Sequence, residues 1–411
     1  MKKLVRFKLS ALALLGFTFM FTQCDFTAPR ESREVQPQNE DYYVENNDPM
    51  GVDFTASDRT DPNFFDQVNI SDPINFKNLQ IFFIENAAPA ACREEYITLQ
   101  EAMDSNWVKI FETGEVNELE AKNYSDESIY INAGDIIKGG RQDRTLAYDV
   151  ILHPKSRKQA LTSFCVESGR WSQRGDEQAD GFSETTKMIS SREMKIASKK
   201  ENNQSHVWEG VSNMQTKLSS NVSNYYSKDV VVNDAASSSS LELALDNKDL
   251  ENLRLEYTAQ FIEAIRDNHY GIAYAINGEL YNIDMFSNHD LFYKLYEKLL
   301  NAAIIEAIAE LDTESNNFTY LTKKDVKDLL KIDANADMSA KRLNGRTYWY
   351  EEDAEDLVIF TTVDDKCKDN WLHKNFVFKS ENYVEWEEEY ADYEMPHQQL
   401  NNVIDGTNLN W

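Results

Sequence analysis

The chain has 411 residues, 71 of them acidic and 42 of them lysine or arginine, so its formal net charge is −29. Nucleic acid and anionic lipid surfaces are therefore poor partners, because binding them takes a basic face that Lys and Arg rarely provide against such an excess of acid. A hydrophobic content of 41% and an aromatic content of 12% are enough for the core of one large or two modest domains.

The N-terminus has the features of an export signal. Four basic residues among the first eight are followed by the uncharged stretch Leu9–Thr22 and then by Cys24. An apolar run of about 14 residues is too short to span a bilayer, which takes roughly 20, so we interpret residues 1–23 as a cleaved signal peptide. We expect Cys24 to carry the lipid of a cell-envelope lipoprotein, on the periplasmic or surface side of a membrane. The alternative is an ordinary secretory signal followed by an incidental cysteine.

The next elements point to a tether and then a β-rich half-domain. Residues 24–77 are rich in Pro, Asp, Asn and Glu without a periodic apolar pattern, which is typical of a disordered tether. Folding is predicted to begin at the apolar run Leu79–Ile84. Short strand-like runs separated by turn signals follow, and they favour an antiparallel sheet or sandwich. These runs are Val108–Glu112, Glu118–Asn123, Ser128–Ile131, Thr145–Leu152 and Ala160–Val166.

The second half of the domain is predicted to be helical. Apolar periodicity indicates helices at Gln204–Leu218, Leu250–Arg266 and Asp290–Leu311. Between the last two, the pair Asn277 and Gly278 separates two apolar runs and predicts a β-hairpin, because Asn-Gly accepts the positive φ of a type I′ turn. Two pairs have the spacing of helix capping boxes. They are Ser287 with Asp290, and Thr322 with Asp325.

The last hundred residues return to strand character. Strand-like runs occur at Leu357–Val363 and Phe376–Phe378, and an acidic tail lies at Glu385–Glu394. Together the elements predict an α+β fold, with an antiparallel β-sheet or sandwich in the first half of the domain, packed with a helical second half that contains the hairpin. We place this domain at residues 78–312 and treat residues 313–411 as a C-terminal extension with a short helix, strands and the acidic tail.

The most unusual segment is Gly134–Arg144, whose sequence is Gly-Asp-Ile-Ile-Lys-Gly-Gly-Arg-Gln-Asp-Arg. The segment Phe164–Trp171 follows further along the chain. Paired glycines permit a tight turn and the close approach of another group, and arginines offer planar donor forks for a carboxylate or a phosphate. In so acidic a chain, Arg141 and Arg144 are conspicuous.

Five motifs in consistent order give the chain a resemblance to a known family. They are Thr113–Leu119, Gly134–Arg144, Phe164–Trp171, Ala275–Glu279, and Phe286 with Leu291–Leu295. In these residues the chain resembles the domain family named for its association with ADP-ribosylglycohydrolases and rhodanese-like phosphatases, type one, over residues 78–312. The resemblance implies a setting in ADP-ribose or phosphate metabolism, since the family is named for its genomic neighbours and not for a reaction. An exported member departs from that cytoplasmic setting.

The segment supports two interpretations. In the first, it binds or processes a small anionic ligand, phosphorylated or related to ADP-ribose, with Asp135, Asp143 and Glu167 as candidate catalytic acids. The residues expected to contact that ligand are Lys138, Gly139, Gly140, Arg141, Gln142, Arg144, Arg170 and Trp171. In the second, the same charges form a buried network that serves the fold, and the protein is a non-catalytic structural or protein-binding module of the envelope.

Both interpretations require the two motifs to meet in space. A hairpin formed by the last two of the strand-like runs would bring Arg144 close to Glu167. Arg141 and Arg170 would join them there. Opposite charges within about 4 Å of one another, or of a shared anion, are the geometry that either interpretation needs.

Metal and cofactor sites are not predicted. Asp333, Asn335 and Asp337 match the first positions of a calcium loop, but Met338 stands where Gly is needed and Asn344 where a Glu belongs. The scattered histidines include no zinc motif, and no Gly-Lys-Ser/Thr sequence closes a phosphate-binding loop. We therefore expect neither a resident metal nor a cofactor.

Three cysteines follow Cys24. Cys165 has no identifiable His partner in the sequence, and such a residue is more often a small core hydrophobe than a nucleophile. Because Cys165 belongs to the family motif, we expect it to be unpaired. This leaves Cys92 with Cys367 as the plausible disulfide in a compartment that permits one.

Overall fold

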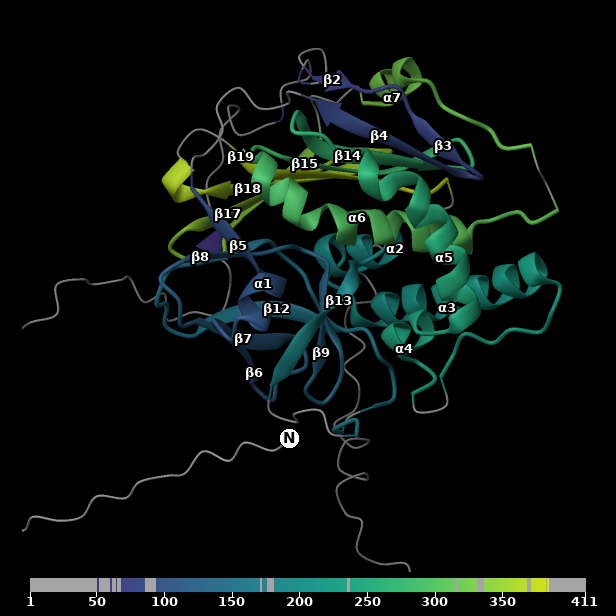
Figure 1. Ribbon diagram of the computed structural model, residues 1–411. Helices are drawn as coiled ribbons and strands as arrows, with labels where there is room; N and C mark the ends of the chain where they lie inside the picture. Colours follow the sequence, from purple (N-terminus) through teal and green to yellow (C-terminus); the bar gives the residue numbers. More distant parts are fainter. Residues whose placement is uncertain are drawn as a thin grey trace, which may run out of the picture. The chain divides into compact units, whose positions relative to one another are not determined.

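The computed structural model describes residues 50–51, 60, 64, 68–85, 94–170, 172–175, 181–234, 237–314, 317–330, 336–367, 371–381 and 383 (Figure 1). All of them belong to a compact unit of residues 44–411, and the other unit, residues 1–43, lies outside the described residues. The predicted signal peptide, Cys24, most of the tether and the acidic tail at Glu385–Glu394 therefore also lie outside them.

The largest element is a ten-stranded sheet in the order β1-β16-β17-β18-β19-β15-β14-β4-β2, with β3 also paired to β4. All of its described pairs are antiparallel. The strands are β1 (Met50–Gly51), β2 (Asn69–Ile70), β3 (Ile74–Phe76), β4 (Leu79–Glu85), β14 (His269–Ile276), β15 (Glu279–Phe286), β16 (Asp337–Arg342), β17 (Thr347–Asp353), β18 (Leu357–Asp364) and β19 (Trp371–Phe378). Strands β16 to β19 lie beyond residue 312, yet they complete the same sheet as β4, β14 and β15.

A second, six-stranded sheet has the order β13-β9-β10-β12-β7-β6. An isolated antiparallel bridge joins Phe111 to Gly181, the residue before β13, so the two outermost strands meet and the sheet closes as a small barrel (Figure 1). Its strands are β6 (Val108–Glu112), β7 (Glu118–Asn123), β9 (Asp135–Gly139), β10 (Arg144–Leu146), β12 (Gln159–Cys165) and β13 (Phe182–Ile189). A third sheet pairs β8 (Ser128–Ile131) antiparallel with β11 (Val150–Leu152) and parallel with β5 (Tyr96–Thr98).

The helices gather between and beside these sheets. They are α1 (Leu99–Asp104), α2 (Arg192–Lys195), the π-helix η3 (Ile196–Lys200), α3 (Gln204–Tyr226), α4 (Leu241–Leu245), α5 (Lys248–Phe261), α6 (His289–Ala309) and α7 (Lys323–Leu329), with short 3₁₀ turns at Ile262–Ala264 and Asp365–Cys367. Helix α6 is buried along most of its length and packs against β14, β13, α5 and α3 (Figure 1). A helix that is apolar on nearly every side has to be covered on every side.

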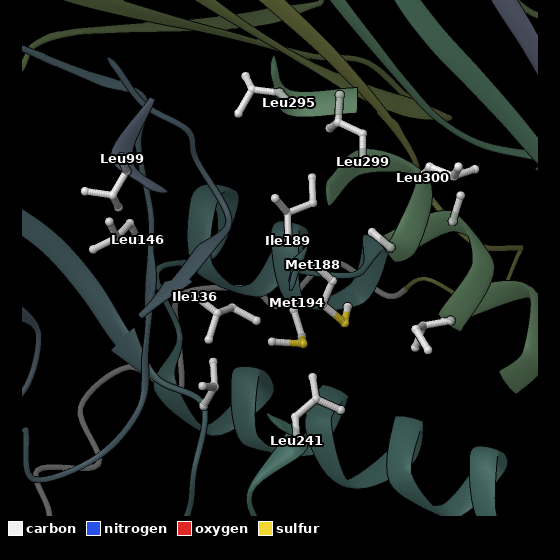
Figure 2. Close-up of a cluster of buried hydrophobic side chains, with 14 of the residues drawn as sticks. Leu99, Ile136, Leu146, Met188, Ile189, Met194, Leu241, Leu295, Leu299 and Leu300 are labelled. Carbon is white, nitrogen blue, oxygen red and sulfur yellow. The ribbon is translucent and has the colours of Figure 1, made fainter. Parts of the chain in front are cut away.

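Two hydrophobic clusters lie on the two faces of the ten-stranded sheet. The larger one joins that sheet to the helices and the barrel, and Figure 2 shows its centre, where side chains of β9, β13, α2, α4 and α6 meet. The labelled residues are Leu99, Ile136, Leu146, Met188, Ile189, Met194, Leu241, Leu295, Leu299 and Leu300. The smaller cluster lies on the other face and includes Val326 of α7. The α+β class predicted from the sequence is confirmed.

Local signals predicted several elements correctly. The turn between β14 and β15 has φ of 54° at Asn277 and 85° at Gly278, which confirms the hairpin. Thr322 and Asp325 form the capping box of α7. The box predicted for Ser287 and Asp290 is wrong, because the cap of α6 is Asn288, whose side chain accepts the N–H of Leu291.

The predicted single strand Thr145–Leu152 is also wrong. The segment divides into β10 in the barrel and β11 in the three-stranded sheet. The chain leaves the barrel at Asp149, whose buried carboxylate accepts the backbone N–H of Ala133 at 2.6 Å. A tertiary contact thus ends a run that the local pattern continues.

Candidate functional site

The paired glycines bring the chain close to the protein's own groups. Gly139 and Gly140 have φ of 125° and 57°, a region that side chains rarely adopt. A Cβ atom on Gly139 would lie 2.8 Å from the carbonyl oxygen of Gly181, and one on Gly140 would lie 2.4 Å from Oε1 of Glu112. That Glu112 oxygen also accepts the backbone N–H of Arg141 at 3.0 Å. The space that the two missing side chains leave is therefore occupied by the start of β13 and by Glu112, not left open for a ligand.

Arg144 is fully buried and is held by the barrel. Its guanidinium donates to the carbonyl of Val116 at 2.6 Å, contacts the sulfur of Cys165 and lies 3.5 Å from a carboxylate oxygen of Glu112. The predicted approach of Arg144 to Glu167 is wrong, because the ion pairs of Glu167 within the described part of the chain are with other arginines. Register explains the error: Arg144 lies opposite Cys165, the last residue of β12, so Glu167 lies beyond the end of the paired strand.

The preceding residue, Asp143, meets Glu167 instead. Asp143, Glu167, Arg170 and Arg174 form a group that we call the arginine–carboxylate cluster. Arg170 lies 2.5 Å from Glu167 and 3.4 Å from Asp143, and Arg174 lies 3.1 Å from Asp143 and 3.5 Å from Glu167. Sequence reasoning brought Glu167 and Arg170 together but missed Arg174. The available signal for Arg174 was its position four residues after Arg170 in so acidic a chain.

A serine-rich loop covers this cluster. The hydroxyl of Ser237 donates to Glu167, the hydroxyl of Ser239 donates to the carbonyl of Ser168, and Arg174 donates to the hydroxyl of Ser240 at 3.3 Å. Ser240 is also the N-cap of α4. The loop thus ties the cluster to the helical half of the domain.

The ionisation of the cluster follows from its burial. Burial raises the pKa of Asp143, and the charge of Arg174 offsets only part of that effect. Burial also acts to raise the pKa of Glu167, but hydrogen bonds from Arg170 and Ser237 hold that pKa below its ordinary value. Two carboxyl groups facing two guanidinium groups leave the cluster close to neutral.

The other predicted site residues also have internal partners. Asp135 is buried 2.5 Å from Lys298 of α6, and Lys138 lies 3.3 Å from Glu242 of α4. Gln142 donates to the backbone carbonyl of Glu167 at 2.8 Å. Arg141 is exposed. Trp171 lies outside the described residues, as do Asp333, Asn335 and Cys92.

The two described cysteines differ. Cys165 is free and buried, as predicted, and burial raises the pKa of its thiol to about 11. A thiol with so high a pKa is a poor nucleophile at neutral pH, because the thiolate is the reactive form. Cys367 is disulfide-bonded, as the predicted bridge requires.

A comparison with protein-family models assigns the chain to a family. The model of the ARG and Rhodanese-Phosphatase-superfamily-associated Protein (ARPP-1) domain matches residues 67–377. The chain belongs to this family. The ARPP-1 match extends past the range 78–312 that we expected, and it takes in the strands β16 to β19. No curated protein and no solved structure matches the chain.

The ARPP-1 domain also contains a buried ionic network that no sequence pattern indicated. His373 of β19 lies 2.7 Å from Asp149 through Nδ1 and 3.1 Å from Asp284 of β15 through Nε2. Lys195 of α2 lies 3.5 Å from Asp284, and Lys199 of η3 donates to an asparagine of β19 at 2.8 Å. Burial acts to lower the pKa of His373, but the two aspartates hold it above its ordinary value. Burial lowers the pKa of Lys199 to about 8.

This network joins the ten-stranded sheet to the rest of the ARPP-1 domain. All five side chains are buried, and both ring nitrogens of His373 face carboxylates. The residues come from four separate elements and from the turn before β11. Their spacing in the sequence is therefore not a metal-binding or catalytic spacing, which is why sequence reasoning missed them.

A small cavity beside α2 has a different character. Its volume is about 20 Å³, and it is lined by Ser191, Arg192, Glu193, Met214, Lys217, Tyr281, Glu306 and Glu310. Such a volume holds about one water molecule or one hydroxyl group. A surface groove of about 440 Å³ adjoins it and shares Lys217 and Glu310. The groove's other lining residues are Thr216, Ser220, Asn221, Ala309, Leu311 and Asp312.

Glu306 is the buried acid of this cavity. Its Oε1 accepts the backbone N–H of Arg192 at 2.8 Å and the hydroxyl of Tyr274 at 3.2 Å. Its Oε2 has no hydrogen-bond partner among the described residues. Burial raises the pKa of Glu306 to about 7. A carboxyl group with a pKa near neutrality, at a cavity, is a typical feature of functional sites.

Two cations flank Glu306. The guanidinium of Arg192 lies 3.6 Å from the ring centre of Tyr281 and pairs with Glu279 at 2.5 Å. The ammonium of Lys217 pairs with Glu310 at 2.6 Å. Within the described ranges no group of three His, Cys, Asp or Glu side chains could hold a metal ion, and no helix there could cross a membrane.

Proposed function

We propose that the protein is a lipoprotein of the cell envelope, anchored to a membrane through Cys24. We also propose that its ARPP-1 domain binds a small anionic ligand in the groove that adjoins the cavity beside Glu306, with one hydroxyl group of the ligand in that cavity. The anchorage is supported by the N-terminal order of basic residues, apolar run and cysteine. The ligand site is supported by Glu306, a buried acid with one unpartnered oxygen between two cations.

The anchorage predicts a modified N-terminus. Mass spectrometry of protein extracted from membranes should find Cys24 as the first residue, carrying two or three acyl chains. Cys24→Ala should release the protein from the membrane fraction, because the anchor is then lost. A mature N-terminus at another residue, or unchanged membrane attachment of the variant, would contradict the proposal.

The flanking cations favour an anionic ligand, and the cavity beside Glu306 favours one that also carries a hydroxyl group. Arg192, whose side chain is 8% exposed, pairs with Glu279. Lys217 pairs with Glu310 and also lies 3.9 Å from Glu193. The Lys217–Glu310 pair is partly exposed on both sides, and exposed ion pairs contribute only about 0–1 kcal/mol. A ligand anion therefore replaces Glu310 beside Lys217 at little cost. The cavity has room for one hydroxyl group beside Glu306. A phosphorylated sugar has both groups.

Titration calorimetry tests this site. The probes are ribose 5-phosphate, ADP-ribose and inorganic phosphate, added to the chain from residue 24 onward. Lys217→Gln should weaken binding of the phosphorylated sugars by about tenfold or more, because a charge-assisted hydrogen bond contributes roughly 1.5–3 kcal/mol. Lys228→Gln, at an exposed lysine just after the end of α3, removes the same charge elsewhere and should leave binding unchanged. Binding of none of the probes would reject the ligand site.

The second candidate function is a non-catalytic structural or protein-binding module. The closed arginine–carboxylate cluster favours it, because the acids that could act as catalysts in the predicted segment are held by arginine or lysine. In this case residues 134–171 serve the fold. A folded protein that binds none of the three probes is the outcome expected from this candidate.

A further inference from the structure

The outer side of the barrel carries an unusual set of side chains. Lys109 and Phe111 alternate along β6, and Trp107 lies just before that strand. Lys122 lies near the end of β7, and Tyr124 lies just after it. Lys109 is directly opposite Lys122, and Trp107 accepts the backbone N–H of Tyr124 at 2.7 Å. Together with Lys158, just before β12, these residues form what we call the aromatic–lysine face. Figure 1 shows β6 and β7 on the side of the barrel away from α3 and α4.

The rings of this face are open to solvent. Trp107 and Tyr124 are 39% and 45% exposed, although large apolar groups are usually covered. The lysines lie over aromatic rings. Lys109 and Lys158 are 5.1 Å and 4.3 Å from the ring centre of Phe111, and Lys122 is 4.8 Å from that of Tyr124.

The positive charge of the face costs stability. Like charges directly opposite each other on neighbouring strands repel, as Lys109 and Lys122 do. Neither has a carboxylate within ion-pair distance among the described residues, in a chain with 71 acidic residues. Lys158 does pair with Glu120, at 2.6 Å. Within the fold, the contacts of Lys109 and Lys122 with aromatic rings are what offsets this repulsion.

We propose that the aromatic–lysine face rests on an anionic phospholipid surface. The proposal depends on the proposed anchorage, which keeps the body near a membrane. Exposed Trp and Tyr are suited to the boundary between headgroups and acyl chains, and lysines near an anionic leaflet are attracted to it. Because the chain as a whole is strongly acidic, the rest of the body is repelled, and the protein orients with this face toward the lipid. The net charge of −29 disfavours an anionic surface for the chain as a whole, whereas these lysines make one face locally basic.

Vesicle sedimentation tests the face without the anchor. The chain from residue 24 onward, carrying Cys24→Ser, is mixed with vesicles of equal parts phosphatidylglycerol and phosphatidylcholine, or of phosphatidylcholine alone. We expect binding to the anionic vesicles that exceeds binding to the neutral ones and falls as salt is raised. The triple variant Lys109→Gln, Lys122→Gln, Lys158→Gln should weaken binding to the anionic vesicles by roughly a hundredfold.

A matched control separates the face from net charge. Lys228→Gln, Lys323→Gln, Lys324→Gln removes three exposed lysines from other elements and should bind as the unsubstituted chain does. Trp107→Ala with Tyr124→Ala should weaken binding in a background that keeps all the lysines.

Three outcomes overturn the proposal: no preference for anionic vesicles, equal weakening by both triple variants, or no effect of removing the two rings. Each is independent of lipid at Cys24, because the tested chain has none. A mass spectrum without acyl chains on Cys24 would reject the proposed anchorage. Absence of preferential binding to the anionic vesicles would reject the proposal that the aromatic–lysine face rests on lipid.

Discussion

Arg144→Ala is expected to lower the free energy of unfolding by about 3–5 kcal/mol, whereas Arg141→Ala is expected to change it by less than about 0.5 kcal/mol. Arg144 is buried in the barrel, and its loss leaves the nearly buried Glu112 without its ion-pair partner. Arg141 is exposed, and the group it offers to Glu112 is a backbone N–H, which alanine retains. Denaturant unfolding of the two variants measures both values.

A double substitution identifies the cause. Arg144→Met with Glu112→Gln removes both charges and keeps much of the side-chain volume, so it should be less damaging than Arg144→Ala alone. If Arg141→Ala lowers the free energy of unfolding as much as Arg144→Ala does, Arg141 is not the exposed residue that the structure shows. Equal and small effects would show that Arg144 is not needed by the fold.

Local sequence signals were sufficient for most secondary structure. The bounds predicted for Val108–Glu112, Glu118–Asn123 and Ser128–Ile131 are those of β6, β7 and β8. Alternation and turn residues act within a few positions, so the sequence contains the information directly. The bend at Asp149 depends instead on Ala133 and His373, which are distant in the chain. No local pattern encodes such a contact.

Side-chain direction was the main error at the predicted site. The two motifs do meet, but through Asp143, and Arg144 faces the other way. The repeat of a strand is two residues, so an error of one position moves a side chain to the opposite face. The pairing of β10 with β12 was predictable, whereas the register, which sets the residues that lie opposite each other, was not. Arg174, which completes the arginine–carboxylate cluster, lies beyond the motif that drew attention to Arg170.

The cavity beside Glu306 was beyond sequence reasoning for a different reason. Its lining comes from α2, α3, β15 and α6, which are separated by long stretches of chain. Glu306 itself stands in an apolar helix, where a single acid has no motif around it. The packing of α6 against β14 turns that residue into a buried acid with a raised pKa, although the hydrogen bond from Arg192 of α2 acts to lower the pKa. Its burial and its raised pKa are properties of the tertiary structure.

The pH dependence of stability should change with Glu306→Gln. The folded protein holds a proton on Glu306 up to about pH 7, whereas the carboxyl group ordinarily releases it near pH 4.5. A raised pKa in the folded state means that this group's stabilisation is complete below pH 4.5 and is lost as the pH rises toward 7. The loss amounts to about 3 kcal/mol. Glutamine stays neutral and can still accept the bonds from Arg192 and Tyr274.

Denaturant unfolding from pH 4 to pH 8 checks this expectation. The variant should match the unsubstituted protein at pH 4 and exceed its stability at pH 8 by up to about 3 kcal/mol. Glu351, whose pKa burial also raises to about 7, remains in both proteins, so the difference between them isolates Glu306. Glu310→Gln removes a partly exposed acid of the same cavity, paired with Lys217, and should not reproduce the gain. If the difference in free energy of unfolding between the two proteins is the same from pH 4 to pH 8, Glu306 has the same pKa in the folded and the unfolded state. The proposed contact of Glu306 with a ligand would then not depend on a bound proton.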